Sequence, residues 1–207
     1  MIIIKDIFED FLNFYKNEEY FKTITELSKY DNSLKSLLIN DNKLFSCDDL
    51  AQLAINWLNN YLKNDVYKHM SVDGLGTFYN KNNLNLFFVE FKHITTNSRN
   101  KSKIRKDLKL KPLESLYCIL PHLIDKFCND DKKEYKGKEE EILNFLFNCP
   151  KCYFCVIEDS NPNPAHRQVN FKKDFYDVKR LYKHPFNKVE ILNSKEFGYF
   201  IDKLNIL

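Results

Sequence analysis

The chain has 207 residues, a hydrophobic fraction of 43% and a net charge of +3, which together predict one domain of ordinary size with a sizeable core. The apolar run at the N-terminus ends at Lys5, and no apolar stretch approaches the roughly 18 residues of a membrane span, so we expect neither a secretory signal nor a membrane segment. The six cysteines then indicate reduced thiols in a cytoplasmic protein.

The first 45 residues have the pattern of helices. Large apolar residues recur at helical spacing over residues 4–22, and a weaker pattern covers residues 23–40. A stronger stripe of leucine, alanine, tryptophan and tyrosine predicts a helix over residues 46–63. We therefore expect an N-terminal helical extension over residues 1–45, followed by one globular α/β domain over residues 46–207.

Three strands are expected next, over residues 66–71, 73–79 and 84–94. The last one carries large apolar residues at consecutive positions, which is typical of a strand buried on both faces. Residues 80–83 are rich in asparagine, which tolerates the positive φ of a tight turn. The last two strands are therefore predicted to form a β-hairpin.

The turn decides which residues of the hairpin face each other. If Tyr79 opposes Leu84, then Asp73 opposes Glu90, and the period of two puts Lys92 on the same face. Charged groups at the end of a buried strand are costly unless something compensates them. Two acids and a lysine on one face are what a divalent ion needs for phosphodiester hydrolysis. The simpler alternative is a Glu–Lys pair that reaches solvent.

A polar, basic segment over residues 95–111 follows the hairpin and is expected to be a loop. Pro112 then opens a helix, in which Pro121 predicts a kink or a break. The remaining expected elements are a helix over 139–147, a strand over 152–157, a loop over 161–164, a helix over 171–183, a strand over 187–192 and a helix over 194–205.

This order of elements, with Asp73 ahead of a Glu90-x-Lys92 motif, resembles the PD-(D/E)xK nuclease superfamily, which includes restriction endonucleases, Holliday-junction resolvases and RecB-type nucleases. In that family an acid begins the second core strand and the Glu-x-Lys motif ends the third. The resemblance covers residues 46–160, with Val72 in place of the proline. It implies an α/β fold with a restriction-endonuclease-like αβββαβ core and a mixed central sheet flanked by helices.

The resemblance also implies roles for individual residues. Asp73 and Glu90 would bind Mg²⁺, which Mn²⁺ can replace, and Lys92 would position or activate the attacking water. The family often has a further acid on the helix before the first strand, where we prefer Asp49 to Asp48, although both also suit a helix N-terminus. The implied activity is that of a metal-dependent nuclease, for which DNA is favoured over RNA as the substrate. RNA and a homodimer both stay open.

Seven cations lie within 13 residues directly after the Glu-x-Lys strand. They are Arg99, Lys101, Lys103, Arg105, Lys106, Lys109 and Lys111. Their position favours contact with nucleic-acid phosphates, since neutralising phosphates dominates nucleic-acid affinity. The alternative is a solvated loop.

Several other groups are weaker candidates. Cys149, Cys152 and Cys155 look like half of a zinc site, but a structural zinc site usually needs four ligands. Two of these cysteines fall in an expected strand and would point to opposite faces, which favours buried thiols. His93 is expected to face away from the motif lysine, and Glu114 lies in the first turn of the next expected helix.

Two other classes of function stay open. The same fold with an inactive site could bind nucleic acid or a protein partner, and this class differs from a nuclease in whether divalent metal binds at Asp73 and Glu90. The other class is a cysteine-coordinated structural protein, which would carry stoichiometric zinc or iron. The sequence has no P-loop, dinucleotide-binding or zincin motif.

Overall fold

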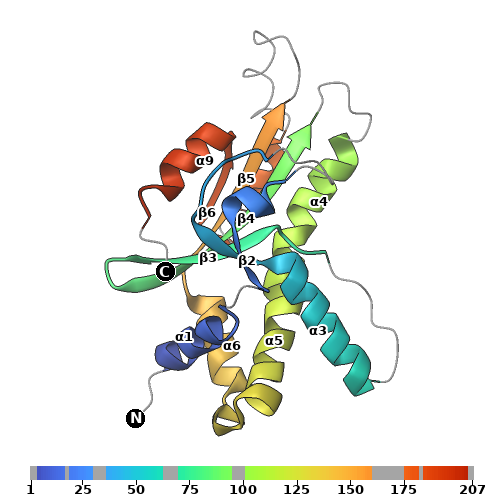
Figure 1. Ribbon diagram of the computed structural model, residues 1–207, viewed down its shortest axis with the longest axis vertical. Coiled ribbons are helices and arrows are strands. Elements are labelled where there is room, and N and C mark those ends of the chain that lie inside the picture. The colour runs from blue at the N-terminus through green and yellow to red at the C-terminus, as the bar shows by residue number, and fades with distance from the viewer. Residues whose placement is uncertain are drawn as a thin grey trace.

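The computed structural model describes residues 4–16, 19–29, 36–62, 70–94, 101–159, 175–181 and 184–204. These residues form an α/β fold in which helices flank a six-stranded mixed sheet (Figure 1). The strands are β1 (Phe21–Thr23), β2 (Lys43–Ser46), β3 (Gly74–Asn80), β4 (Asn83–Ile94), β5 (Lys151–Asp159) and β6 (Lys188–Leu192). Within this part of the chain, no helix is long and apolar enough to cross a membrane.

The helical segments are of three kinds. The α-helices are α1 (Ile4–Phe14), α2 (Ile24–Leu27), α3 (Cys47–Leu62), α4 (Lys101–Glu114), α5 (Leu120–Lys126), α6 (Glu139–Asn148) and α9 (Ser194–Ile201). Two π-helical turns, η1 (Ser115–Ile119) and η2 (Phe127–Asp131), continue α4 and α5. Two 3-10 helices are η3 (Lys133–Tyr135) and η4 (Tyr176–Leu181).

The strands are arranged in the sheet in their chain order, β1 to β6. Neighbours from β1 to β4 are antiparallel, whereas β4, β5 and β6 are parallel to one another. The parallel connection from β4 to β5 carries the helices α4 to α6, as such crossovers require. The mixed sheet flanked by helices is therefore confirmed, while the restriction-endonuclease-like core stays a prediction.

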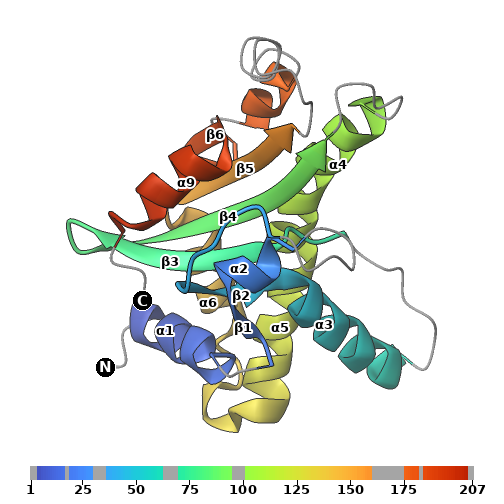
Figure 2. The same ribbon diagram turned by 45° about the horizontal axis from the view of Figure 1, so that its top comes forward.

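Strand β4 lies at the centre of the sheet because its side chains are apolar on both faces. Leu86 and Phe88 belong to the larger core, which lies under α1 and the helices α3 to α6. Phe87 and Val89 belong to a second core on the opposite face, where Phe197 of α9 packs. Figure 2 shows α2 and α9 on one side of the sheet and the long α4–α5 rod on the other.

The hairpin has the register that the sequence predicted. Tyr79 pairs with Leu84, and the turn consists of Lys81 and Asn82, both with positive φ. Gly76 makes room for the ring of the opposing Phe87, because a Cβ at position 76 would lie only 2.2 Å from that ring. The expected strand boundaries are thus correct to within one residue.

The N-terminal prediction was wrong in part. The helix expected over residues 4–22 ends at Phe14, and β1 follows it. In the described part of the helix expected over residues 23–40, which omits residues 30–35, only Ile24–Leu27 is helical. Pairing of β1 with β2 at the edge of the sheet overrides the weak helical spacing of this region. The expected domain boundary at residue 46 consequently falls at the last residue of β2.

The basic segment is also corrected. Residues 101–111, expected in a loop, belong to α4, and residues 95–100 lie outside the described residues. Pro112 lies inside this helix rather than at its start. A proline has no N–H for the carbonyl four residues earlier, and here the Leu108 carbonyl accepts the Tyr153 hydroxyl at 2.8 Å instead. Pro121 stands near the start of α5, directly after the π-helical turn η1.

The later elements follow the predictions closely. The helices expected over 139–147 and 194–205 correspond to α6 and α9, and the strands over 152–157 and 187–192 correspond to β5 and β6. The described part of the helix expected over 171–183 is the 3-10 helix η4. The loop over 161–164 lies outside the described residues, as does most of the strand over 66–71, whose last two residues are not in a strand.

Candidate active site

Asp73 and Glu90 lie beside each other where β3 begins. Asp73 directly precedes β3, and the next pair along the hairpin is Gly74 with Val89. The Oδ2 atom of Asp73 accepts a hydrogen bond of 2.6 Å from the backbone N–H of Phe91. This bond holds the Asp73 carboxylate against β4, next to the residue that the hairpin register predicted.

Glu90 is the most buried charged residue of the site, with none of its side chain exposed. Its Oε1 atom is 2.7 Å from the Nζ atom of Lys92 and 2.7 Å from the Nζ atom of Lys111. Its Oε2 atom is buried and has no hydrogen-bond partner among the described residues. A buried carboxylate oxygen without a partner is uncommon in native proteins, because its desolvation is not compensated.

Lys111 enters the site from α4. It lies one turn after the buried Leu108 and one turn before the buried Ser115, so helical spacing places it on the inward face of the helix. Its Nζ atom is 3.9 Å from Oδ1 of Asp73. The hydroxyl of Ser115, the first residue of η1, accepts a hydrogen bond of 3.0 Å from the backbone N–H of Val72, which attaches the chain before Asp73 to the continuation of α4.

The charges of this cluster act strongly on one another. Burial raises the pKa of Asp73 well above its usual value, and Glu90 acts in the same direction, while Lys111 and Lys92 oppose them. Burial alone would lower the pKa of Lys111, but the carboxylates of Glu90 and Asp73 outweigh it and raise that pKa. Both ammonium groups thus contact Glu90, and that of Lys111 also lies near Asp73.

The two acids at the start of α3 have different partners. Asp49 pairs with Lys22 of β1, with 2.5 Å between Nζ and Oδ2. Asp48 accepts a hydrogen bond from the hydroxyl of Ser71 and contributes to the raised pKa of Lys111. The acid of α3 that acts on the cluster is therefore Asp48, whereas the sequence interpretation preferred Asp49.

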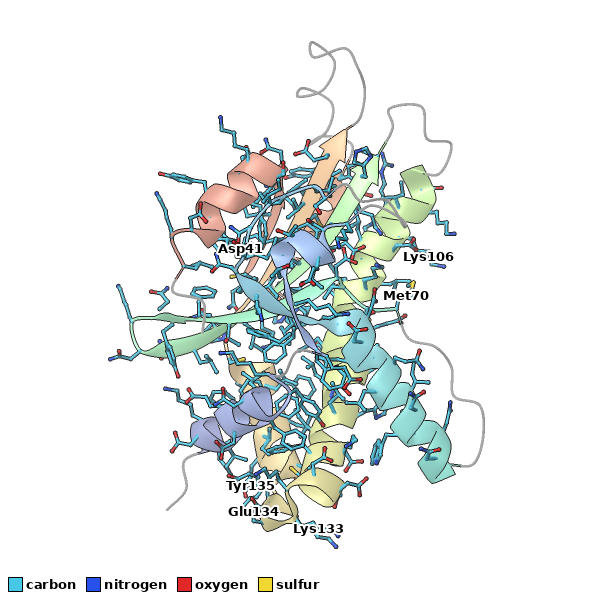
Figure 3. All side chains as sticks on the ribbon, viewed as in Figure 1. Asp41, Met70, Lys106, Lys133, Glu134 and Tyr135 are labelled. Atoms are coloured by element: carbon cyan, nitrogen blue, oxygen red, sulfur yellow. The ribbon has the colours of Figure 1, made fainter. Side chains whose placement is uncertain are left out.

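The cations expected to bind phosphates have several environments. Lys103 and Lys106 are exposed, and Figure 3 shows Lys106 on the outer side of α4. Lys109 pairs with Asp177 of η4 at 3.4 Å, and the buried Nε atom of Arg105 has no hydrogen-bond partner among the described residues. With Lys111 in the acidic cluster, the open face of α4 is smaller than the sequence suggested.

The other two members of this set cannot be placed. Arg99 and the side chain of Lys101 lie outside the described residues.

A polar cavity of about 170 Å³ opens beside Asp73 and Lys92. One wall comes from the motif strand and the residue before β3, and the other comes from α2 and the segment after it. The lining residues are Leu27, Ser28, Lys29, Leu37, Asp73, Phe91, Lys92 and His93. The N-terminal part of the chain therefore shapes access to the candidate site.

The side chains that were weaker candidates for function contact the protein's own backbone or its cores. The Oε2 atom of Glu114 accepts a hydrogen bond of 2.6 Å from the backbone of Met70, which Figure 3 labels, at the start of the segment that leads to Asp73. Cys152 and Cys155 pack in the two cores on opposite faces of the sheet, as expected. The cysteines are free thiols, and among the described residues no group of three or more His, Cys, Asp or Glu side chains is arranged to hold a metal ion.

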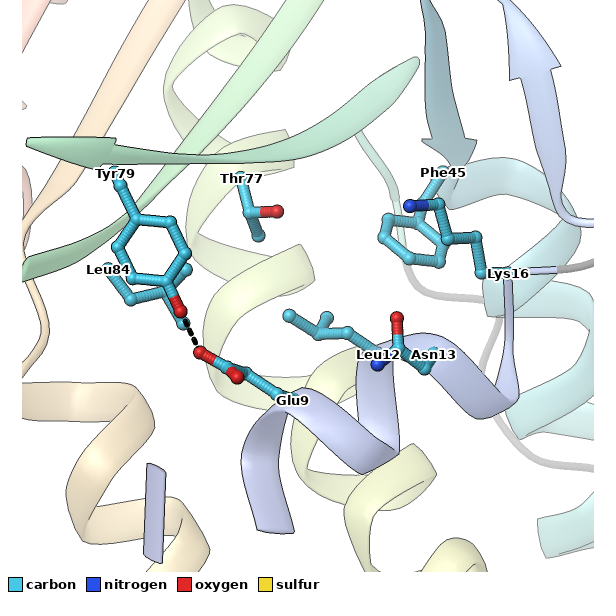
Figure 4. Close-up of a pocket in the computed structure, with 8 residues that line it drawn as sticks. All are labelled: Glu9, Leu12, Asn13, Lys16, Phe45, Thr77, Tyr79 and Leu84. Atoms are coloured by element: carbon cyan, nitrogen blue, oxygen red, sulfur yellow. Dashed lines mark hydrogen bonds between the residues drawn. The ribbon is translucent and has the colours of Figure 1, made fainter. Parts of the chain in front are cut away.

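A second cavity, of about 230 Å³, lies at the opposite end of β3, between that strand and α1 (Figure 4). Two of the polar groups that line it already have partners. The Tyr79 hydroxyl donates a hydrogen bond to Glu9, and the Lys5 ammonium lies 4.5 Å from the centre of the Tyr79 ring. It holds no pair of carboxylates comparable to Asp73 and Glu90.

Comparisons of the chain with protein-family models, with curated proteins and with solved structures found no match. The function therefore has to be inferred from the geometry of the Asp73–Glu90 cluster and of the cavity beside it.

Proposed function

We propose that this protein is a divalent-metal-dependent nuclease that hydrolyses phosphodiester bonds at the Asp73–Glu90 cluster. The observation that carries the proposal is the carboxylate of Glu90. It is fully buried, it lies beside a second acid, and one of its oxygens has no hydrogen-bond partner among the described residues. A cation bound between the two acids would compensate both of them.

The residues present fit such an ion. The oxygens that could hold it are Oε2 of Glu90 and Oδ1 of Asp73, because the other oxygen of each carboxylate already accepts a short hydrogen bond. Carboxylate oxygens are the hard ligands that Mg²⁺ and Mn²⁺ prefer. When bound, such an ion supplies charge stabilisation at the phosphate oxygens and a water of lowered pKa.

The chain's own groups would orient the reactants. The Lys92 ammonium contacts Glu90, and the residue also lines the polar cavity, so this side chain lies between the buried acid and the space that a phosphate would enter. It would hold the attacking water in place and offset the charge that develops on the phosphate. Lys29, across the cavity, adds a second cation that favours an anionic substrate.

Nucleic acid is the proposed substrate because exposed lysines continue from the site along α4. Lys103 and Lys106 are open to solvent on this helix, and phosphate contacts of this kind supply affinity without sequence preference. The preference for DNA over RNA is based on the resemblance of the Asp73 and Glu90-x-Lys92 pattern to the PD-(D/E)xK nucleases.

Cleavage assays with single-stranded, duplex and branched DNA and with RNA test the proposal. Mg²⁺ or Mn²⁺ should support cleavage of at least one of these substrates by the wild-type protein, and Asp73→Asn and Glu90→Gln should each abolish it. Glu141→Gln is the control, because Glu141 forms an exposed pair with Lys138 outside the site and should be dispensable for cleavage. Metal-dependent cleavage that survives in both site variants would contradict the proposal.

A second candidate function is a nucleic-acid-binding module without catalysis. It is favoured by the two lysines that already balance the two carboxylates, because such a cluster is neutral without any metal. A protein of this class would bind nucleic acid through α4 equally well with and without Mn²⁺. It would cleave none of the substrates named above.

A further inference from the structure

Lys111 lies against both carboxylates that would hold a metal ion. Its ammonium nitrogen is 2.7 Å from Oε1 of Glu90 and 3.9 Å from Oδ1 of Asp73, so one cation already lies within reach of both carboxylates. It reaches them from α4, the element after the motif strand, rather than from the hairpin that carries the acids. No part of the Glu-x-Lys motif requires a cation from this helix.

The surroundings of Lys111 hold it there in the absence of a metal. The cluster contains the carboxylates of Asp73 and Glu90, the ammonium of Lys92, and Asp48 within electrostatic range of Lys111. A divalent ion that entered this cluster would face the positive charge of Lys111 at close range, in surroundings that screen charge poorly. The ion and the ammonium would therefore compete for the same carboxylates.

We propose that Lys111 is an internal counter-ion that holds the two carboxylates in place in the metal-free protein, gives way when a divalent ion binds, and then contacts the phosphate of the bound nucleic acid. This inference rests on the proposed function and adds a regulatory step to it. Metal and nucleic acid would then favour each other's binding, since the phosphate offers Lys111 a new partner as the ion takes its place.

The structure gives Lys111 the freedom that this exchange requires. Its side chain is 17% exposed, so it lies at the open edge of the cluster, whereas Glu90 is fully enclosed. A lysine has a flexible four-carbon stem, which allows the ammonium to move without a change in the helix. The backbone of α4 stays attached to the sheet through the hydrogen bond from Tyr153 to the Leu108 carbonyl.

Calorimetric Mn²⁺ titrations of the purified protein without nucleic acid test the competition. Lys111→Met should bind Mn²⁺ at least about tenfold more tightly than the wild-type protein, within the range of common coupling effects. Lys126→Met is the matched control, because the Lys126 side chain is also 17% exposed and pairs with an acid outside the cluster, Asp131. Its Mn²⁺ affinity should stay within about twofold of the wild-type value.

A phosphorothioate DNA duplex, which resists hydrolysis, tests the link to nucleic acid. Saturating amounts of it should tighten Mn²⁺ binding to the wild-type protein about tenfold, within the usual range of coupling between two ligands. In Lys111→Met most of this coupling should disappear. Equal coupling in the two proteins would show that another group responds to the phosphate and would overturn that part of the proposal.

A third measurement uses only the wild-type protein and so does not depend on how Lys111→Met folds. Brief acetylation with acetic anhydride, read by mass spectrometry, should modify Lys111 slowly without metal and several-fold faster with saturating Mn²⁺. Lys151, which is buried elsewhere, should stay protected in both cases. An unchanged rate at Lys111 in Mn²⁺-saturated protein would overturn the inference.

The outcomes separate the inference from the proposed function. If Mn²⁺ binds the wild-type protein but neither the Lys111→Met affinity nor the acetylation rate changes, the inference fails and the metal site stands. If the wild-type protein binds no Mn²⁺ with or without DNA, the proposed function fails and the inference fails with it.

Discussion

Lys151 is buried and Lys111 is largely enclosed, and the partners of these two lysines differ in charge. Lys151, at the start of β5, is 1% exposed, and its Nζ atom donates to the backbone carbonyls of Phe147 at 2.8 Å and Cys149 at 2.6 Å. Lys111 instead contacts the carboxylates of Glu90 and Asp73. Burial lowers the pKa of Lys151, whereas the two acids raise that of Lys111.

The difference shows how burial alone fails to identify a functional charge. Lys151 satisfies carbonyls at the C-terminal end of α6, where a cation suits the free acceptors of the helix and no ligand has access to replace it. Lys111 satisfies carboxylates that can also bind another cation. We therefore assign a structural role to the first lysine and an exchangeable one to the second.

The largest effect should come from removing the negative charge of Glu90, which contacts Lys111 but not Lys151. Glu90→Gln should abolish both Mn²⁺ binding and cleavage, because the variant lacks the negative charge that the ion needs. Cleavage should fall by more than about 100-fold, since mutating even a residue that only contacts a metal ligand commonly reduces activity by 10–100-fold. Glu190→Gln is the control, as Glu190 forms only surface pairs with Lys179 and Lys188, and it should cleave normally.

Lys92 shares Oε1 of Glu90 with Lys111 but, unlike Lys111, also lines the cavity. Lys92→Met should reduce cleavage about 100-fold or more, the lower range for a positioned proton-transfer group. It should keep or tighten Mn²⁺ binding, because a cation near the ion is removed. Calorimetric Mn²⁺ titration measures this, and a much weaker affinity would indicate that Lys92 supports the structure of the site.

Thermal unfolding with and without Mn²⁺ compares the two lysines directly. Lys151→Met leaves two buried carbonyls without their donor and should destabilise the fold by about 2–4 kcal/mol. The midpoint should fall by about 5–10 °C, and Mn²⁺ should not restore it. Lys111→Met should also lower the midpoint, but saturating Mn²⁺ should recover most of the decrease, since the ion replaces the missing ammonium.

The reverse pattern, in which Mn²⁺ rescues Lys151→Met and leaves Lys111→Met unstable, would remove the distinction between the two lysines. Lys138→Met, at an exposed pair with Glu141, gives the baseline for a surface substitution.

The smallest effect concerns the exposed lysines of α4. Replacing Lys103 and Lys106 by alanine should flatten the slope of log affinity against log salt by about 0.7–0.9 for each phosphate that is no longer neutralised. Cleavage at saturating substrate should change less than binding, because these groups position the nucleic-acid backbone. Fluorescence anisotropy over a range of salt concentrations measures the slope. An unchanged slope would show that these lysines are merely solvated.

The hairpin could be predicted from the sequence because local rules determine it. The four consecutive apolar residues Leu86, Phe87, Phe88 and Val89 indicate a strand that is buried on both faces, and the turn at Lys81–Asn82 sets the register. Opposition of Asp73 and Glu90 follows from that register alone. The N-terminal strands could not be predicted in this way, since β1 is only three residues long and depends on pairing with β2.

The role of Lys111 was missed because the segment that carries it was interpreted as a basic loop. The inward spacing of Leu108, Lys111 and Ser115 is visible in the sequence, but it has meaning only once α4 is known to be a helix. Pro112 argued against that helix, because the hydrogen bond that compensates for it comes from Tyr153, on a strand far along the chain. Tertiary contacts of this kind are not encoded locally.

The proposed nuclease requires a divalent ion bound between Asp73 and Glu90. Crystals soaked in Mn²⁺ and measured at the manganese absorption edge would locate that ion. We expect an anomalous peak in contact with a carboxylate oxygen of each acid, with the Lys111 ammonium moved away from its position 2.7 Å from Glu90. A structure at saturating Mn²⁺ with no peak at these carboxylates, and with Lys111 still in place, would contradict the proposed metal site.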